Sequence, residues 1–162
     1  MTRSPTPSQT VGPFYAIGLC RRPENELVAR DDAGAVTLAG TLFDGAREPI
    51  VDGVIEVWDA VGGKWGRSGT DGQGRFSFVL VKPDGGPHGA PHLDVYVFAR
   101  GLLKHQLTRI YFPDEAEANA ADPVLATLTD ADRATLVADG ADGALRFDIR
   151  LQGDDATVFF VP

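Results

Sequence analysis

The chain has 162 residues, 43% of them hydrophobic and 23% charged, which are ordinary proportions for one soluble globular domain. Its formal net charge of −8 repels phosphate backbones and excludes nucleic acid as a natural partner, so an anionic ligand would need an arginine placed beside it. The one cysteine, Cys20, excludes an intrachain disulfide and a cysteine-based zinc site.

Residues 1–34 lack sustained periodicity and contain Pro5, Pro7, Pro13 and Pro23. This composition predicts an extended arm with turns, of the kind that a partner surface holds in place. The arm opens without the apolar core of a secretory signal, and no run in the chain approaches the ~18 apolar residues of a membrane span. We therefore expect a cytoplasmic protein that does not bind membranes.

Short apolar or alternating segments follow the arm and are separated by turns rich in Gly, Pro and Asp. The predicted strands are 35–43, 54–60, 75–81, 93–99, 106–112, 145–152 and 157–161. The alternation is strictest in 145–152, which predicts a half-buried strand. The glycine-rich segment 62–74 has no order typical of a phosphate-binding loop, so we interpret it as turns. Seven short strands at this spacing predict an all-β fold, an antiparallel β-sandwich.

One or two short helices complete the prediction. Thr129 and Asp130 are suited to cap a helix that runs through Val137, with Gly140 as its stop. The alanine-rich segment 114–122 has acidic residues at its start, which favours a turn or two of helix there.

His92 and Asp94 are the first candidates for chemistry. They are two residues apart on a predicted strand, so both side chains lie on one face, in a spacing that metal ligands use. The alternative is a hydrogen-bonded pair at the strand entrance, which we favour because a single His-x-Asp is common. Tyr96, Phe98 and Arg100 continue the same face. An arginine among aromatic residues binds a carboxylate or stacks on a ring, or it forms a structural salt bridge.

The sequence contains no pattern that indicates nucleophilic catalysis. Arg21 and Arg22 are placed to lower the pKa of Cys20, but no histidine is near it in sequence, so a packed or idle thiol is the simpler interpretation. From its residues alone, the chain is an acidic β-sandwich without a complete catalytic set, and a binding module explains it as well as an enzyme does.

Several strings, in order and over nearly the whole chain, resemble those of the intradiol ring-cleaving dioxygenase family, and in particular the alpha chains of its heteromeric members. They lie at 6–19, 55–60, 81–85, 90–120 and 145–160. TPSQTVGPF and VFARG…TRIYF are the most specific of them. The resemblance implies a β-sandwich, a ferric non-haem iron, and O2-dependent opening of 3,4-dihydroxybenzoate between its hydroxylated carbons to give 3-carboxy-cis,cis-muconate.

The resemblance also implies that Fe(III) is bound by a partner beta chain, through two tyrosines and two histidines. The His-x-His of such beta chains falls at His92 and Asp94, so the first histidine alone is present as a vestigial position. One tyrosine ligand falls near Trp65, and the other in loop 82–91, which contains no tyrosine. Indole N–H cannot coordinate iron. We therefore predict that this chain alone binds no catalytic iron and has no catalytic residue of its own.

The resemblance further implies that the alpha chain contributes substrate-binding residues to the active site. Gly12, Pro13 and Phe14 match a Gly-Pro-Tyr segment that lines the substrate pocket, with Tyr15 directly after them, and Arg100 matches the arginine of a Phe-Ala-Arg-Gly motif. Phe14 replaces the expected tyrosine, and glycine with proline would form a thin, rigid wall for a flat ring. Arg100 would bring positive charge to the anionic substrate or to a tyrosinate of the partner.

The expected organisation is an arm, 1–34, that contacts the partner chain and the active site, and a sandwich domain, 35–162. The partners would be the beta subunit, within a higher αβ oligomer, the aromatic acid and O2. Segment 60–75 is shorter than the family leads us to expect, so the substrate range could differ. Two alternatives stay open: a self-sufficient metalloenzyme that uses His92 and Asp94, and a transthyretin-like or carbohydrate-binding sandwich without catalysis.

Overall fold

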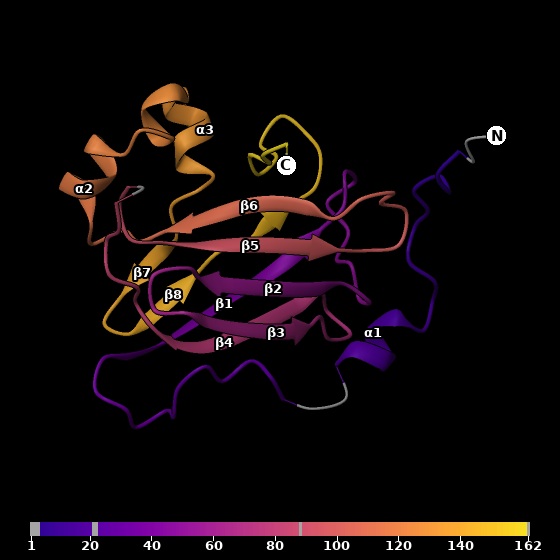
Figure 1. Ribbon diagram of the computed structural model, residues 1–162, viewed down its shortest axis with the longest axis horizontal. Helices are drawn as coiled ribbons and strands as arrows, with labels where there is room; N and C mark the ends of the chain where they lie inside the picture. The colour runs from indigo at the N-terminus through magenta and orange to yellow at the C-terminus, as the bar shows by residue number, and fades with distance from the viewer. Residues whose placement is uncertain (1–3, 21–22, 88, 162) are drawn as a thin grey trace.

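A computed structural model describes residues 4–20, 23–87 and 89–161 of the chain, and these form a β-sandwich of two sheets (Figure 1). The strands are β1 (Ala35–Phe43), β2 (Val54–Asp59), β3 (Lys64–Gly69), β4 (Arg75–Val81), β5 (His92–Phe98), β6 (Gln106–Tyr111), β7 (Asp139–Ala141), β8 (Ala144–Arg146) and β9 (Ile149–Arg150). The helices are α1 (Tyr15–Leu19), α2 (Ala116–Ala121) and α3 (Asp130–Ala134), with the 3-10 turn η1 (Leu125–Thr127). One sheet has the order β4-β1-β8-β7, with β9 also paired to β1, and the other has the order β3-β2-β5-β6.

The core lies between the two sheets and comes from alternate residues of the strands. In β5, buried and half-buried residues alternate along the whole strand, as its sequence predicts. Fully buried side chains of both sheets meet there, among them Leu38, Leu42, Ile55, Phe78 and Ile110. Burial of these apolar groups is the main source of stability, and it leaves the other face of β3-β2-β5-β6 to polar and aromatic side chains.

β3 is a strand that the sequence did not predict. From the sequence its glycines are interpreted as turn residues, but Gly66 makes a close packing contact: a Cβ atom there would lie 2.4 Å from Cδ1 of Leu27 and 3.0 Å from the carbonyl oxygen of Glu24. The glycine lets Leu27, from the N-terminal segment, pack against the core. The prediction of turns over 62–74 is therefore wrong for its central part, and for a packing reason that local sequence does not reveal.

The predicted strand 145–152 is divided into β8 and β9. Gly40 of β1 passes so close to Phe147 that a Cβ atom at Gly40 would lie 1.8 Å from the carbonyl oxygen of Phe147. At the break, the Asp148 carboxylate accepts a hydrogen bond from the Thr41 amide at 3.0 Å. Both β8 and β9 run parallel to β1, so this sheet is mixed and not purely antiparallel. The predicted strand 157–161 makes one bridge, between Leu107 and Phe160.

The predicted helices are present but short. Thr129 caps α3, with its hydroxyl oxygen accepting from the Asp132 amide at 3.2 Å, and α3 ends at Ala134, before the predicted end at Val137. α2 lies inside the predicted segment 114–122. Among the helices of the described residues, none is long and apolar enough to cross a membrane.

The N-terminal segment carries α1, and residues near its end already pair with the sheets. Glu24 forms a bridge with Arg67 of β3, and Glu26 forms one with Val79 of β4. The division of the chain at residue 34 stays a prediction, but this pairing attaches the second half of the segment to the sandwich.

Candidate functional site

Three segments far apart in the sequence meet at the end of the sandwich where α1 lies (Figure 1). Tyr15 comes from α1, Asp52 from the turn between β1 and β2, and Arg100 lies two residues beyond the end of β5. The Asp52 carboxylate forms an ion pair with Nε of Arg100. The Tyr15 hydroxyl lies 2.5 Å from the carbonyl oxygen of Asp52 and 2.9 Å from that of Phe98. Two predicted site residues thus converge on Asp52, which the sequence did not single out.

Tyr15 acts as an anchor at this place. Burial raises the pKa of its phenol well above the usual 10.0, Asp52 and Cys20 add to the rise, and Arg100 opposes it. The hydroxyl therefore stays protonated and donates to backbone carbonyl oxygens. Its engagement holds α1, and with it the preceding residues, against the end of β5.

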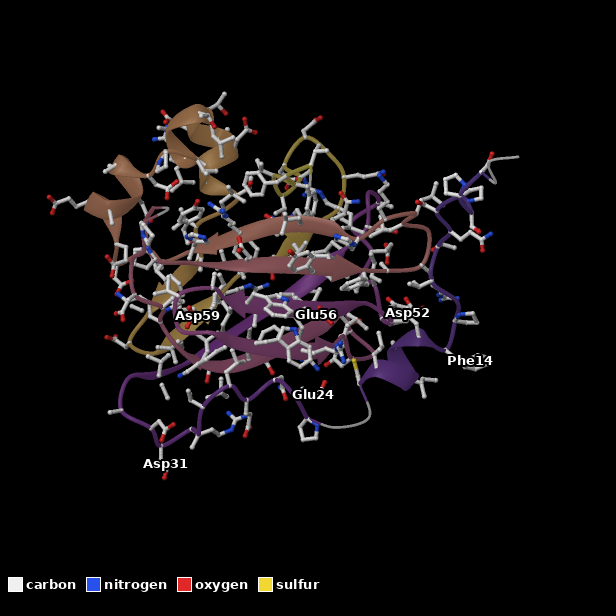
Figure 2. The ribbon with its side chains drawn as sticks, in the orientation of Figure 1. Phe14, Glu24, Asp31, Asp52, Glu56 and Asp59 are labelled. Atoms are coloured by element: carbon white, nitrogen blue, oxygen red, sulfur yellow. The ribbon has the colours of Figure 1, made fainter. Side chains whose placement is uncertain are left out.

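Gly12, Pro13 and Phe14 lie on the surface directly before this anchor. All three are exposed, and Phe14 keeps 75% of its surface accessible, which is unusual for a large apolar ring. Figure 2 shows Phe14 at the same end of the molecule as Asp52. The Gly101 amide donates to the Thr10 hydroxyl oxygen at 2.8 Å, which ties this stretch to the turn after Arg100. The predicted wall of glycine, proline and an aromatic ring is therefore presented outward and not folded into the core.

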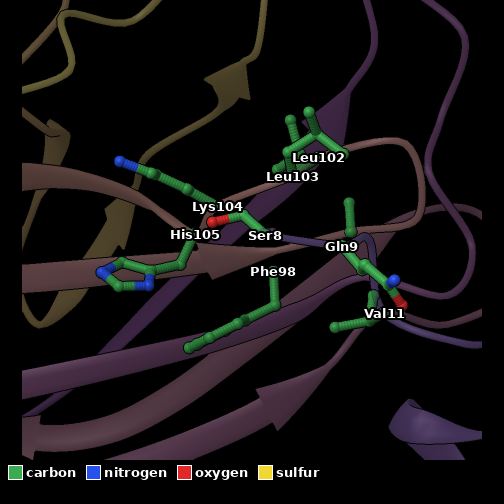
Figure 3. Close-up of a pocket in the computed structure, with 9 residues that line it drawn as sticks. Ser8, Gln9, Val11, Phe98, Leu102, Leu103, Lys104 and His105 are labelled. Carbon is green, nitrogen blue, oxygen red and sulfur yellow. The ribbon is translucent and has the colours of Figure 1, made fainter. Parts of the chain in front are cut away.

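A groove of 380 Å³ separates the N-terminal segment from the turn between β5 and β6 (Figure 3). Its lining residues are Ser8, Gln9, Val11, Phe98, Ala99, Leu102, Leu103, Lys104 and His105. The His105 ring lies 5.3 Å from the Tyr96 ring and 5.6 Å from the Phe98 ring, between centroids. The groove is thus a mainly apolar surface with Lys104 and His105 among its lining residues.

The predicted His92–Asp94 pair has a different arrangement from either interpretation. His92 Nε2 lies 3.9 Å from Asp94 Oδ1, which is too far for a hydrogen bond, and the Asp94 carboxylate instead accepts from Arg109 Nε at 3.0 Å. His92 Nδ1 lies 2.7 Å from the carbonyl oxygen of Ala90, so this nitrogen carries the proton. Arg109 occupies the carboxylate that a metal at this place would use.

Tyr111, which lies at neither of the two tyrosine-ligand positions that the resemblance implies, packs beside His92 with 5.4 Å between the ring centroids. Its hydroxyl donates to the buried Asp122 carboxylate at 3.2 Å. Burial raises the pKa of Tyr111, and Asp122 also raises it, while the Arg109 guanidinium opposes the shift. The phenol therefore stays protonated, whereas a ferric ligand would have to be a tyrosinate.

Trp65 stands on β3 opposite Trp58, where the resemblance places a tyrosine ligand. Arg67 lies over the Trp65 ring at 4.7 Å, and the buried Nε1 of Trp65 has no hydrogen-bond partner in the described structure. An indole N–H is a donor only, so Trp65 offers no lone pair to a metal. Within residues 4–20, 23–87 and 89–161, no three His, Cys, Asp or Glu side chains are grouped as metal ligands. The donor set at His92 therefore does not fit ferric iron.

Cys20 has a pKa that is raised by burial, with Arg67 lowering it and Glu24 raising it further. Arg21 and Arg22, which the sequence places near this thiol, lie outside the described residues. The thiol is held near Gly69, where a Cβ atom would lie 3.2 Å from Cys20 Sγ. This arrangement agrees with a packed thiol.

Comparisons with known proteins identify relatives over nearly the whole chain. The chain is 39% identical over 193 residues to the protocatechuate 3,4-dioxygenase alpha chain of Burkholderia cepacia, covering 98% of both chains. It is 39% identical over 191 residues to the corresponding alpha chain of Pseudomonas putida, covering 96% of this chain and 95% of that one. It is also 26% identical over 156 residues to the protocatechuate 3,4-dioxygenase beta chain of Burkholderia cepacia, covering 75% of this chain and 66% of the beta chain. Both alpha-chain alignments are longer than this chain, so those relatives carry residues that it lacks.

Solved structures agree with the fold. The dioxygenase domain of a carbohydrate-binding fusion protein from Streptomyces sp. SirexAA-E superposes with a TM-score of 0.65 at 23% identity, covering 96% of this chain and all of that one. Catechol 1,2-dioxygenase from Acinetobacter sp. ADP1 gives 0.59 at 19% identity, over 77% of this chain and 55% of its own. No family model matches the chain. Its identity to two alpha chains over nearly their full length places it in a family: the chain belongs to the protocatechuate 3,4-dioxygenase alpha chains.

Proposed function

We propose that this chain is the alpha subunit, without iron, of a protocatechuate 3,4-dioxygenase. The complex would open 3,4-dihydroxybenzoate with O2, between its hydroxylated carbons, to 3-carboxy-cis,cis-muconate. The observation that carries the proposal is the 39% identity to two alpha chains of this enzyme over at least 95% of each relative. We further place Fe(III) on a beta partner and the complex, an αβ oligomer, in the cytoplasm.

The location of iron on the partner is supported by the donor chemistry at His92. Asp94 is paired with Arg109, and Tyr111 keeps its proton beside Asp122. A site with one free imidazole nitrogen and a guanidinium lacks the anionic oxygen ligands that ferric iron favours. The metal chemistry therefore belongs to the beta chain in this proposal.

The alpha chain would shape and charge one side of the substrate pocket. Gly12, Pro13 and Phe14 are exposed and available to a partner surface, and Arg100 keeps 55% of its side chain accessible. A guanidinium beside an anionic aromatic acid stabilises the bound carboxylate and orients the ring. The exposed apolar rings would also exclude water from the ring once the partner covers them.

The test is to purify this chain alone and together with the beta chain from the same source, and to measure iron and O2 uptake with protocatechuate. We expect substoichiometric iron and no activity in the isolated chain, and activity with about one iron per αβ unit in the complex. Matched preparations of the beta chain alone would show how much the alpha chain contributes. Protocatechuate cleavage by the isolated chain, with iron of its own, would sink the assignment of roles. Failure of this chain to associate with the beta chain would instead support the non-catalytic, transthyretin-like alternative.

A further inference from the structure

Asp52 is the residue on which the two candidate substrate-binding segments converge, and no motif of the chain includes it. We propose that Asp52 is a positioning residue, which fixes the guanidinium of Arg100 and the anchor of the N-terminal segment for binding of the substrate carboxylate. The inference rests on the proposed function, since it concerns the same substrate pocket.

The first support is that Asp52 uses two separate groups. Its carboxylate pairs with Nε of Arg100, and its main-chain oxygen accepts the Tyr15 hydroxyl at 2.5 Å. The Asp52 side chain is 23% exposed and that of Arg100 is 55% exposed, so the carboxylate is the more buried partner of the ion pair. One residue thus sets both the direction of the arginine and the place where the N-terminal segment is attached.

The second support is the rigidity of the turn that carries Asp52. The next residue, Gly53, donates its amide to the Thr70 hydroxyl at 2.8 Å, and its carbonyl oxygen accepts from the Thr70 amide at 2.9 Å. A Cβ atom at Gly53 would lie 2.5 Å from Leu42 Cδ2, so the turn packs directly on the core. Asp52 therefore has a fixed backbone from which to hold Arg100.

The third support is the geometry of the guanidinium group. The contact with Asp52 engages Nε, and a planar guanidinium offers further N–H donors on its two terminal nitrogens. An arginine that is held by one edge presents the remaining edge to a second carboxylate without losing further side-chain freedom. Asp52 thereby orients Arg100 to bind a ring that carries a carboxylate, and it should not strengthen the binding of a neutral ring.

The experiment uses the αβ complex with Asp52→Ala and Asp52→Asn in the alpha chain. The alanine variant should raise KM for protocatechuate about ten-fold with kcat within about two-fold, because binding of the ground state and the transition state weaken together. The asparagine variant keeps an acceptor oxygen for Arg100 Nε, so its KM should stay within about three-fold of the wild type. Asp155→Ala, which removes the surface partner of Arg47 and Arg150, is the matched control.

Two competitive inhibitors of nearly equal shape, 4-hydroxybenzoate and 4-hydroxybenzamide, distinguish positioning of Arg100 for a carboxylate from a purely structural role of Asp52. In Asp52→Ala, inhibition by the anionic acid should weaken about ten-fold and inhibition by the neutral amide should not change. The ratio of the two constants does not depend on the fraction of folded enzyme, so a destabilised variant remains informative. An unchanged ratio, or tighter binding of the acid, would overturn the role of Asp52. Failure of the wild-type complex to consume protocatechuate would instead overturn the proposed function.

Discussion

Arg109 Nε donates to the Asp94 carboxylate across the pair β5–β6, at 3.0 Å, and so places a permanent cation beside the vestigial His92. Of the four iron ligands that the resemblance implies, the chain keeps one, His92. The structure adds a reason why neighbouring side chains do not supply the other three. The Arg109 guanidinium balances the negative charge of Asp94, as a bound metal ion would otherwise do.

This relationship predicts that Asp94→His, which restores a His-x-His pattern, will not restore iron binding. Arg109 would lose its partner and repel a metal cation, and Trp65 still supplies no ligand. We expect less than about 0.1 iron per chain and a loss of stability of about 1 kcal/mol from the partly buried arginine. Iron analysis and denaturant unfolding measure both, with Asp94→Asn as the control for loss of the ion pair. One iron per chain with a tyrosinate absorption band would contradict the prediction.

Asp122 should be among the polar residues that stability depends on most. Its buried carboxylate accepts hydrogen bonds from Tyr111 Oη and from the amides of Ala90, Val124 and Leu125. Asp122→Ala would leave these donors without a partner and should cost about 3 kcal/mol of unfolding free energy. Denaturant titration measures the loss.

The control for that experiment is Asp130→Ala, since the Asp130 side chain is fully exposed at the start of α3. It should change stability by no more than about 0.5 kcal/mol. Equal losses for the two variants would show that the Asp122 hydrogen bonds carry no special weight.

Gly40 should not tolerate any side chain. A methyl group there would meet the carbonyl oxygen of Phe147 at 1.8 Å, which is backbone and cannot rotate away. We expect Gly40→Ala to cost about 3 kcal/mol and to separate β8 from β1. Gly72→Ala is a matched control because a Cβ atom at Gly72 has no neighbour within 4 Å. Thermal unfolding of the two variants compares them, and a Gly40→Ala midpoint equal to that of Gly72→Ala would count against this packing.

Tyr15 should make stability depend on pH in the alkaline range. Its folded-state pKa is raised above 10.0, so the folded chain keeps a proton that the unfolded chain releases. The contribution is fully present below pH ~10 and is lost as pH rises further. Tyr15→Phe should be less stable than the wild type by about 1 kcal/mol near neutral pH, and the difference should narrow above pH ~10. Urea unfolding at a series of pH values gives the difference, and a constant difference up to pH ~11 would refute the assignment.

Phe14 should contribute to assembly and not to the stability of the chain. Its ring is 75% exposed, so truncation removes little within the chain, whereas burial by a partner would be worth about 1.5–3 kcal/mol. Phe14→Ala should therefore weaken binding of the beta chain about 10–100-fold at unchanged melting temperature. Titration calorimetry measures the affinity. Val161→Ala, which alters a residue that is still more exposed and lies near the other terminus, should leave the affinity unchanged, and equal affinities of the two variants would contradict the role of Phe14.

The fold was predictable from sequence wherever a strand alternates regularly. Strands β1 and β4 have the predicted bounds, and β5 and β6 lie within one residue of theirs. Alternation is local, because successive side chains of a strand point to opposite faces whatever the partner is. The prediction failed at Gly66 and at the break after Arg146. In each case a residue distant in sequence packs closely there: Leu27 against Gly66, and Gly40 against Phe147.

The candidate site shows the same division. The sequence by itself determined the family strings, and with them Arg100 and the segment from Gly12 to Tyr15, because these are matched residue by residue. Only the tertiary structure decided that Asp52 joins Arg100 to Tyr15 and that Arg109 neutralises Asp94. Such partners come from different strands and turns, and it is the register of the sheets, set by the burial of the whole core, that brings them within reach of each other.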